Sequence, residues 1–277
     1  MLPHMCLIVF DWRPGADDGA LLTLAANRDE YFSRLSAPLD WWPDQTGVLA
    51  GRDLVGGGTW LGVSRDGRFA ALTNFRAPHA WRADAPSRGA LVAGYLTGPA
   101  VAPLDYLNAL AGHAGRYNGF NLIVGDLFRR ELAWYCNRAD RAPGLLPPGA
   151  HGISNAVLDT PWPKLVRKRA ELSALAEGAR APSLETLVEL MRDPRVAADE
   201  ALPSTGIALE RERALSAAFI ETPDYGTRGT TALRAAIRGA TLELDIVERS
   251  DDDGSHRLTR PGSHQRRYAF IAEPSPY

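Results

Sequence analysis

Cys6 is the first residue whose type and position suggest chemistry. It directly follows Met5, and a small residue after an initiator methionine permits removal of that methionine. If translation starts at Met5, Cys6 becomes the first residue of the mature chain, and Met1 to His4 are an upstream extension. A terminal cysteine carries a thiol nucleophile beside an α-amine, whose ordinary pKa of about 8 suits a general base. The alternative is a small buried strand residue without reactivity.

A second candidate is the polar tetrapeptide Asn27-Arg28-Asp29-Glu30, which ends an apolar segment expected to form a strand. An arginine beside a thiol stabilises the thiolate, which is the nucleophilic form. A nearby carboxylate can hold the α-amine in place. We therefore predict that Arg28 and Asp29 lie near Cys6. The alternative is a surface turn with a salt bridge.

Two asparagines, Asn74 and Asn155, each end a short apolar segment. A side-chain amide can donate a hydrogen bond to the oxyanion of a tetrahedral intermediate. The alternative for each is an Asx turn at the end of a strand. Arg228 lies within Thr227-Arg228-Gly229-Thr230-Thr231, just before a late predicted strand. It could place a cation at the same strand end as Asn27-Arg28-Asp29-Glu30.

The glycine-rich segment Gly56-Gly57-Gly58-Thr59-Trp60 resembles a phosphate-binding loop. It lacks the Gly-Lys-Ser/Thr ending of a P-loop, and a strand rather than a helix is expected after it. We interpret it as a turn of close backbone approach that enters a hairpin. Nucleotide binding is not expected.

The charge and cysteine content exclude several classes of function. The 277 residues include 31 basic and 33 acidic residues, with a formal net charge of -2, so nucleic acid and anionic membranes are not expected partners. The two cysteines, Cys6 and Cys136, form neither a disulfide framework nor a zinc site. The N-terminus shows no signal peptide or membrane span. We expect a cytoplasmic protein whose partner is a small molecule; its oligomeric state stays open.

The elements that must position these residues follow from apolar spacing, turn residues and helix caps. Helices are predicted over 87–95, 103–113, 161–177 and 183–191, the last capped by Ser183, and strands are predicted over 6–12, 20–26, 59–63, 69–73, 120–125, 131–136, 151–154, 217–221, 230–238, 241–248 and 267–271. Basic residues 164–169 are interpreted as a solvated helix face, 192–213 as a surface connection, and 251–254 as a turn. Strands at both ends with helices between them predict one α+β domain spanning 1–277.

The order of these motifs resembles the NRDE family, also called the transport and Golgi organisation protein 2 family. The resemblance rests on Met5-Cys6-Leu7-Ile8, Ala26-Asn27-Arg28-Asp29-Glu30, Gly57-Gly58-Thr59-Trp60-Leu61-Gly62, Thr73-Asn74-Phe75-Arg76, Ser154-Asn155 and Tyr225-Gly226-Thr227-Arg228. It implies an N-terminal-nucleophile hydrolase-like fold, which is a four-layer αββα sandwich. It also invites comparison with the cysteine branch of these hydrolases, the choloylglycine and penicillin V acylases.

That comparison implies a hydrolase acting on a linear amide or a thioester. The positions that match the acylase site are Cys6, Arg28, Asp29, Asn74, Asn155 and Arg228. The acylases space their arginine and aspartate more widely, so either Asn27 or Arg28 could fill the arginine position, and either Asp29 or Glu30 the acid position. If the upstream residues stay attached, the free amine is lost and this mechanism fails.

The alternative is a non-catalytic carrier on the same fold that binds haem or an acyl-lipid. No Cys-Pro or Cys-x-x-Cys-His haem signature is present, and the isolated histidines are expected to be surface or structural: His79, His113 and His151. Four tryptophans could line an apolar groove, although core packing is the favoured interpretation: Trp41, Trp42, Trp60 and Trp81. The hydrolase itself would need no cofactor or metal. A scaffold for membrane traffic has no support without an amphipathic membrane helix.

Overall fold

Two antiparallel sheets form the centre of the molecule. The computed structural model describes residues 5–178, 181–251 and 263–274. The first sheet has the strand order β10 (Gly149–Ile153), β1 (Met5–Trp12), β2 (Gly19–Tyr31), β11 (Tyr225–Arg238), β12 (Thr241–Ser250) and β13 (His264–Ala272). The second has the order β3 (Ser36–Trp42), β4 (Gln45–Asp53), β5 (Leu61–Ser64), β6 (Arg68–Asn74), β7 (Phe120–Asp126), β8 (Glu131–Cys136) and β9 (Gly144–Leu145).

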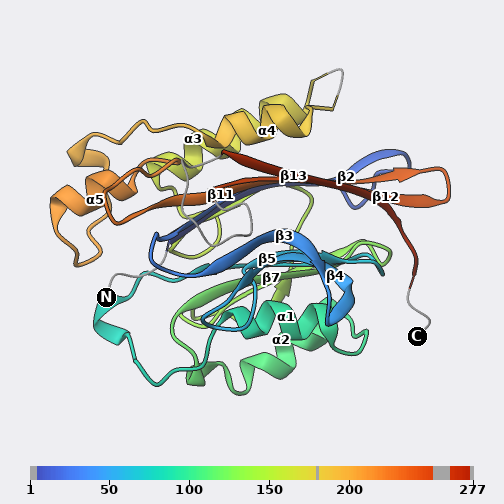
Figure 1. Ribbon diagram of the computed structural model, residues 1–277, viewed down its shortest axis with the longest axis horizontal. Helices are drawn as coiled ribbons and strands as arrows, with labels where there is room; N and C mark the ends of the chain where they lie inside the picture. The colour runs from blue at the N-terminus through green and yellow to red at the C-terminus, as the bar shows by residue number, and fades with distance from the viewer. Residues whose placement is uncertain (1–4, 179–180, 252–262, 275–277) are drawn as a thin grey trace.

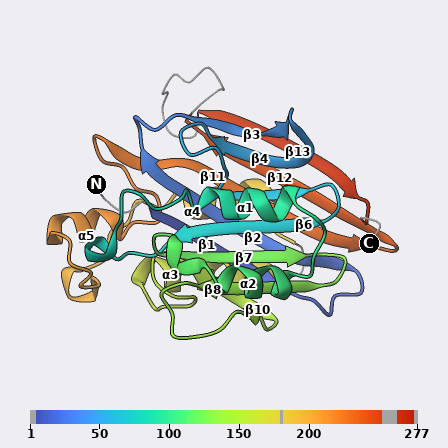
Figure 2. The ribbon, with the colours of Figure 1, turned by 90° about the horizontal axis from the view of Figure 1, so that it is seen from below.

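Helices cover the outer face of each sheet (Figure 1). The helices α3 (Pro163–Ala176) and α4 (Leu184–Met191) pack on the first sheet, and α5 (Leu209–Leu215) lies at its end. The helices α1 (Gly89–Thr97) and α2 (Pro103–Ala111) pack on the second sheet, as Figure 2 shows from below. The predicted four-layer αββα sandwich is therefore confirmed.

Strand β1 shows how the sequence specifies these layers. Side chains alternate between the two faces of a strand, and both faces of β1 are apolar. Ile8 and Phe10 point into the core between the sheets, whereas Leu7 and Val9 contact the cluster beneath α3 and α4. Strand β1 lies between β10 and β2, and each of its faces is covered by an apolar cluster. This is why both faces of β1 carry apolar side chains.

Several predicted elements differ from the structure. The strands β3 and β4 were not predicted. In β3 the sequence signal is interrupted by Pro38, which is tolerated because β3 is an edge strand with an irregular register. The strand predicted over 217–221 is wrong: residues 217–220 are buried, and within the described ranges the segment has no strand partner apart from one bridge between Glu221 and Gly226. The predicted connection over 192–213 contains the start of α5. Residues 1–4 and 252–254 lie outside the described residues.

The prediction that residues 164–169 form a solvated helix face is also wrong. Lys164 and Lys168 are 1% and 2% exposed, because positions four apart share the face of α3 that turns inward. The Lys164 ammonium donates to the carbonyl of Leu215 at 2.9 Å. No helix in the described ranges is both long and apolar enough to cross a membrane.

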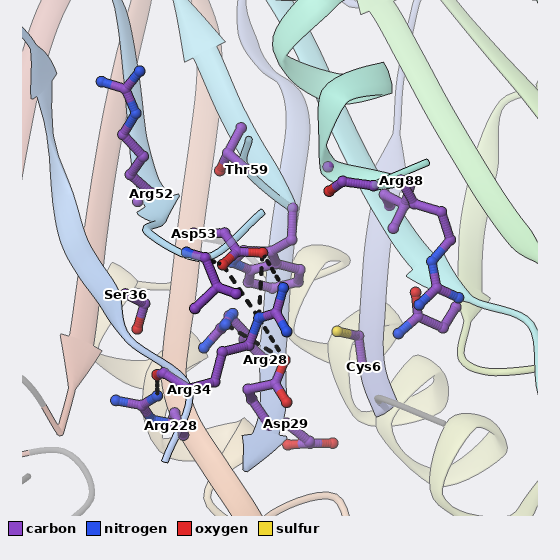
Figure 3. A pocket seen from close by; sticks show the side chains of 18 of the residues that line it. Cys6, Arg28, Asp29, Arg34, Ser36, Arg52, Asp53, Thr59, Arg88 and Arg228 are labelled. Atoms are coloured by element: carbon purple, nitrogen blue, oxygen red, sulfur yellow. Dashed lines mark hydrogen bonds and ion pairs between the residues drawn. The ribbon is translucent and has the colours of Figure 1, made fainter. Parts of the chain in front are cut away.

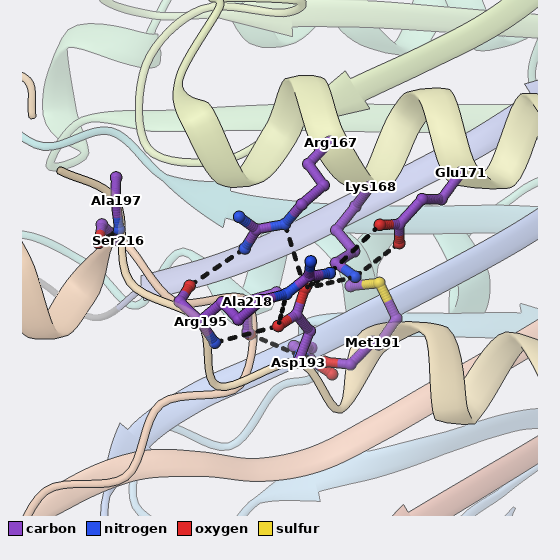
Figure 4. Close-up of polar contacts among 10 residues, drawn as sticks. Arg167, Lys168, Glu171, Met191, Asp193, Arg195, Ala197, Ser216 and Ala218 are labelled. Carbon is purple, nitrogen blue, oxygen red and sulfur yellow. Dashed lines mark hydrogen bonds and ion pairs between the residues drawn. The ribbon is translucent and has the colours of Figure 1, made fainter. Parts of the chain in front are cut away.

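The second inward lysine fastens α3 to the segment that follows α4 (Figure 4). The Nζ of Lys168 lies 2.8 Å from the Asp193 carboxylate and 2.6 Å from Glu171. Arg195 makes two further bonds to Asp193 at 2.8 Å, from Nε and Nη2. Bonds from Arg195 and Lys168 lower the pKa of Asp193 from its ordinary value. These contacts hold the chain between α4 and α5 against the first sheet's helical layer.

Replacing Asp193 by asparagine is expected to lower the free energy of unfolding at pH 7 by about 3 kcal/mol, because the buried ammonium of Lys168 loses its buried anion and keeps only the more exposed Glu171. A carboxylate whose pKa is depressed in the folded state stabilises the fold above its unfolded pKa and loses this effect as the pH falls. The deficit of Asp193→Asn should therefore shrink below about pH 4. Urea unfolding at pH 7 and below pH 4 measures the deficit and its dependence on pH. Asp199→Asn, which removes an exposed ion pair with Arg213, is the control; an equal loss in both variants would contradict the prediction.

Candidate active site

A cavity of about 490 Å³ opens where the ends of several strands meet (Figure 3). Its walls come from β1, β2, β11 and β12 of the first sheet and from β3, β4 and β6 of the second. The segment between Trp81 and Gly89, which leads into α1, closes one side. The cavity therefore lies between the two sheets and draws on residues that are far apart in the sequence.

Cys6 lies in the wall of this cavity. It occupies the same face of β1 as Ile8, so its side chain points between the sheets, and it pairs with Arg28 of β2. Burial raises the pKa of the Cys6 thiol to about 12, and the charge of Asp29 adds to this effect; the backbone N–H of Asp29 and the charge of Arg28 oppose it. The thiol is therefore protonated at neutral pH while Met5 precedes it.

Arg28 and Glu30 share the cavity-facing side of β2. The Arg28 guanidinium lies 3.6 Å from the Glu30 carboxylate, and Arg34 lies equally close to the same carboxylate. Arg34 makes a shorter ion pair of 2.7 Å with Asp53. The tetrapeptide is thus part of the long strand β2, and its charges form a network inside the cavity rather than a surface turn.

Asn27 points to the opposite face of β2, toward the helices. The Asn27 amide donates to the carbonyls of Met191 and Ala218 at 2.9 and 2.7 Å, and Asn27 does not line the cavity. Of the two residues considered for the arginine position, the structure therefore places Arg28 in the cavity. Both residues considered for the acid position, Asp29 and Glu30, line it.

Asp29 is a buried carboxylate with an incomplete set of partners. Its Oδ1 accepts a hydrogen bond of 2.6 Å from Thr227, whereas its Oδ2 has no hydrogen-bond partner among the described residues. Burial raises the pKa of Asp29 to about 6, although the charge of Lys164 opposes this shift. Burial also lowers the pKa of Lys164 to about 8. A buried oxygen without a donor is unusual in a native protein and is available to a group that arrives at the start of β1.

The two asparagines have different places. Asn74 ends β6 and lines the cavity, whereas Asn155 does not. The Asn155 amide donates to the backbone carbonyl of Asn74 at 2.9 Å, and its own carbonyl accepts from the N–H of Arg76 at 2.7 Å. Asn155 thus holds the end of β6 in place, and the structure does not bring it to the cavity with the other predicted residues.

Arg228 enters the cavity at an irregularity in β11. The register between β11 and β2 shifts between Thr227 and Gly229, and such bulges redirect side chains. The Arg228 Nε donates to Asp251 at 2.9 Å, and Nη1 donates to the carbonyl of Arg34. Both side chains of the Arg228–Asp251 pair are only 3% exposed. Arg228 therefore also braces the loop around Arg34.

The charged lining residues that the sequence interpretation did not single out include Arg88, Glu248 and Arg34. Burial raises the pKa of Glu248, whose Oε1 accepts from the Leu39 N–H at 2.7 Å. For Arg88, the glycine-rich segment was the available signal in the sequence. It forms a turn of close backbone approach, as predicted. Gly57 has a φ of +73°, and Gly58 lies against Gly89, the residue after Arg88.

The four tryptophans considered in the sequence lie partly in the cavity and partly in the core, and His151 is buried. Trp60 and Trp81 line the cavity, whereas Trp41 and Trp42 pack into the two core clusters. The imidazole of His151 bonds Asp159 at 2.8 Å and the Pro147 carbonyl at 3.0 Å, which is a structural role. The described lining contains no histidine.

Comparisons with known proteins agree on one family. The family described as Transport and Golgi organisation 2 matches residues 5–251. A Transport and Golgi organization protein 2 homolog of Bos taurus is 39% identical over 89% of this chain and 93% of its own length, and the Homo sapiens homolog is 36% identical over 92% and 97%. Among solved structures, a Caenorhabditis elegans ortholog of N-acylethanolamine-hydrolyzing acid amidase matches with a TM-score of 0.43 and 11% identity, over 67% of this chain and 85% of that one.

Proposed function

The chain belongs to the Transport and Golgi organisation 2 family, and we propose that it is a hydrolase that cleaves a linear amide or a thioester with Cys6 as nucleophile. The observation that carries the proposal is the convergence of five residues on one cavity. They come from four strands that belong to both sheets, β1, β2, β6 and β11: Cys6, Arg28, Asp29, Asn74 and Arg228. Such gathering is what a catalytic site requires.

The reactive form begins at Cys6, which requires translation from Met5 and removal of that methionine. The new α-amine lies at the start of β1, where Met5 pairs with Asp29 in the present chain. The unpartnered Oδ2 of Asp29 then accepts a hydrogen bond from this amine and orients it toward the thiol. The surroundings of Cys6 favour a neutral thiol, so a base beside it is needed.

In the first step, the α-amine takes the thiol proton while the sulfur attacks the substrate carbonyl. Arg28 stabilises the developing thiolate, and the Asn74 amide donates to the oxyanion of the tetrahedral intermediate. The intermediate collapses to an acyl thioester on Cys6, and the amine or thiol leaves with the proton. Water then attacks the acyl group, again assisted by the α-amine, and releases the acid. Asn155 and Arg228 act as positioning residues in this scheme.

The proposal places this reaction in the reducing cytoplasm, where a thiol nucleophile stays reduced. Its direct test is a covalent intermediate. The chain beginning at Cys6 is incubated with a panel of acyl thioesters and N-acyl amines, and the protein mass is followed over time. A transient adduct that maps to Cys6 rather than Cys136, followed by release of free acid, is the expected result. Ligand binding without an adduct or turnover would instead favour the carrier.

Asp29→Asn is expected to remove the reaction while making the fold at least as stable at pH 8. A carboxyl whose pKa is raised by folding, here from 3.8 to about 6, destabilises the native state as it ionises. Ionisation of Asp29 therefore lowers the free energy of unfolding of the wild-type protein as the pH rises from about 4 to about 6. The loss amounts to about 2–3 kcal/mol above that range. Denaturation at pH 4.5 and 8 measures it; a marked loss of stability in Asp29→Asn at pH 8 would assign Asp29 a structural role.

A further inference from the structure

Arg88 is a cation of the cavity that the proposed reaction does not use. Figure 3 shows its side chain on the opposite side of Cys6 from Arg28. Both arginines are electrostatically coupled to the thiol: Arg28 lowers the pKa of Cys6, and a Cys6 thiolate raises that of Arg88. Two guanidinium groups therefore flank the nucleophile, one on each side.

Arg88 differs from most other arginines of the cavity because it has no carboxylate partner among the described residues. Four arginines of the cavity have carboxylate partners within 4 Å, in the pairs Arg28–Glu30, Arg34–Asp53, Arg52–Asp44 and Arg228–Asp251. Arg88 has no such partner among the described residues. Its Nη1 donates to the Gly119 carbonyl at 3.0 Å, and its Nε and Nη2 donate to no described residue. A bidentate edge of the guanidinium thus remains for an anion.

Burial makes this unpaired charge costly. It lowers the pKa of Arg88 to about 10, which marks an environment that disfavours a lone cation. A carboxylate that entered the cavity would compensate the charge and match the planar fork of the guanidinium. Arg88 therefore has the properties of a recognition group rather than those of a structural ion pair.

The glycine-rich turn holds Arg88 at this wall. A Cβ on Gly58 would lie 2.3 Å from the carbonyl carbon of Gly89, so only glycine permits the contact. The Thr59 N–H also donates to the Gly89 carbonyl at 3.3 Å. The turn therefore fixes the backbone directly after Arg88 next to Thr59 and Trp60, which line the same cavity. This contact gives the Gly56-Gly57-Gly58 segment a role without a nucleotide.

We infer that Arg88 binds a carboxylate of the substrate beside the carbonyl group that Cys6 attacks. The inference rests on the proposed role of Cys6 and narrows its substrate class. The substrates are N-acyl or S-acyl compounds that carry a carboxylate close to the scissile bond, on the acyl chain or on the leaving group. Neutral analogues of the same size are poor substrates.

Alkylation of Cys6 tests this inference without a known substrate. Iodoacetate and iodoacetamide alkylate sulfur by the same displacement of iodide and are similar in size, but iodoacetate carries a carboxylate where iodoacetamide carries a neutral amide. The ratio of their rates at Cys6, separated from Cys136 by peptide mapping, is measured for wild type, Arg88→Gln, Arg88→Lys and Arg52→Gln. Arg52→Gln removes the same charge from the same cavity, but from an arginine paired with Asp44 at 2.7 Å.

The iodoacetate-to-iodoacetamide ratio is expected to fall about tenfold or more in Arg88→Gln, to be partly retained in Arg88→Lys, and to stay unchanged in Arg52→Gln. An unchanged ratio in Arg88→Gln, or an equal fall in Arg52→Gln, overturns the inference.

A binding measurement separates this inference from the proposed function. If Cys6 reacts with neither reagent, the proposed nucleophile fails, and calorimetric titration of the Cys6→Ala protein with succinate and succinamide decides on Arg88. Adding Arg88→Gln to this background is expected to weaken succinate binding at least tenfold, about 1.4 kcal/mol, with little effect on succinamide. Absence of succinate binding to Cys6→Ala, or equal affinity in the double variant, overturns the assignment.

Discussion

Cys6→Ala is expected to abolish hydrolysis, with a loss of at least about 10³-fold, because the atom that forms the acyl intermediate is removed. Thermal stability should change little. Cys6 lines an open cavity rather than the closed core between the sheets, so its sulfur leaves a space that water can fill. Turnover of the reactive substrate identified by mass analysis and the melting temperature are measured on the same preparations.

Cys6→Ser makes this test sharper. The hydroxyl is nearly isosteric with the thiol but is a far weaker nucleophile at neutral pH, so activity should again be lost while the fold is kept. Cys136→Ala is the matched control, because Cys136 is also a buried free cysteine but packs in the core away from the cavity. Full activity in Cys6→Ser, or a stability loss of more than about 1 kcal/mol in Cys6→Ala without an activity change, would make Cys6 a packing residue.

A single residue retained before Cys6 is expected to lower the rate of acylation about 10²–10⁴-fold, the usual contribution of a general base. The amide that replaces the α-amine cannot accept a proton, and the surroundings of the thiol raise its pKa to about 12. Two forms of the chain are compared, one that begins at Cys6 and one that carries an additional alanine before it. Single-turnover acylation reports the chemical step in each.

Equal melting temperatures of the two forms serve as the control, since the extra residue only extends β1 by one position. The rate of the form beginning at Cys6 should also rise with pH toward about 8, as the α-amine loses its proton. Equal acylation rates in both forms would mean that another group takes the proton. Lys164, whose pKa burial lowers to about 8 and which is coupled to Asp29, is then the next base to vary.

Much of the layered fold was predictable because its signals are local. The apolar positions of β1 and the Ser183 cap of α4, which accepts the Thr186 N–H at 3.1 Å, depend on neighbours in the sequence. Strand β3 was not predictable in this way. Its Pro38 argues against a strand, and only its place at the edge of the second sheet makes proline acceptable.

The candidate site likewise depends partly on the local sequence and partly on the tertiary structure. The sequence by itself determined which residue types were available: a thiol after Met5, an arginine and acids in β2, and the asparagine that ends β6. Strand alternation then placed Cys6 and Arg28 on one face, because β1 and β2 are adjacent antiparallel strands.

Only the tertiary structure decided the rest, because those contacts join segments distant in the sequence. Packing buried Lys164 and Lys168 of a basic helix that otherwise resembles a solvated one. It turned Asn155 away from the cavity to hold the backbone of Asn74. It also brought Arg88 to the wall of the cavity that Cys6 lines, through the contact of Gly58 with Gly89. No local pattern records such contacts, since each depends on how two separately formed layers meet.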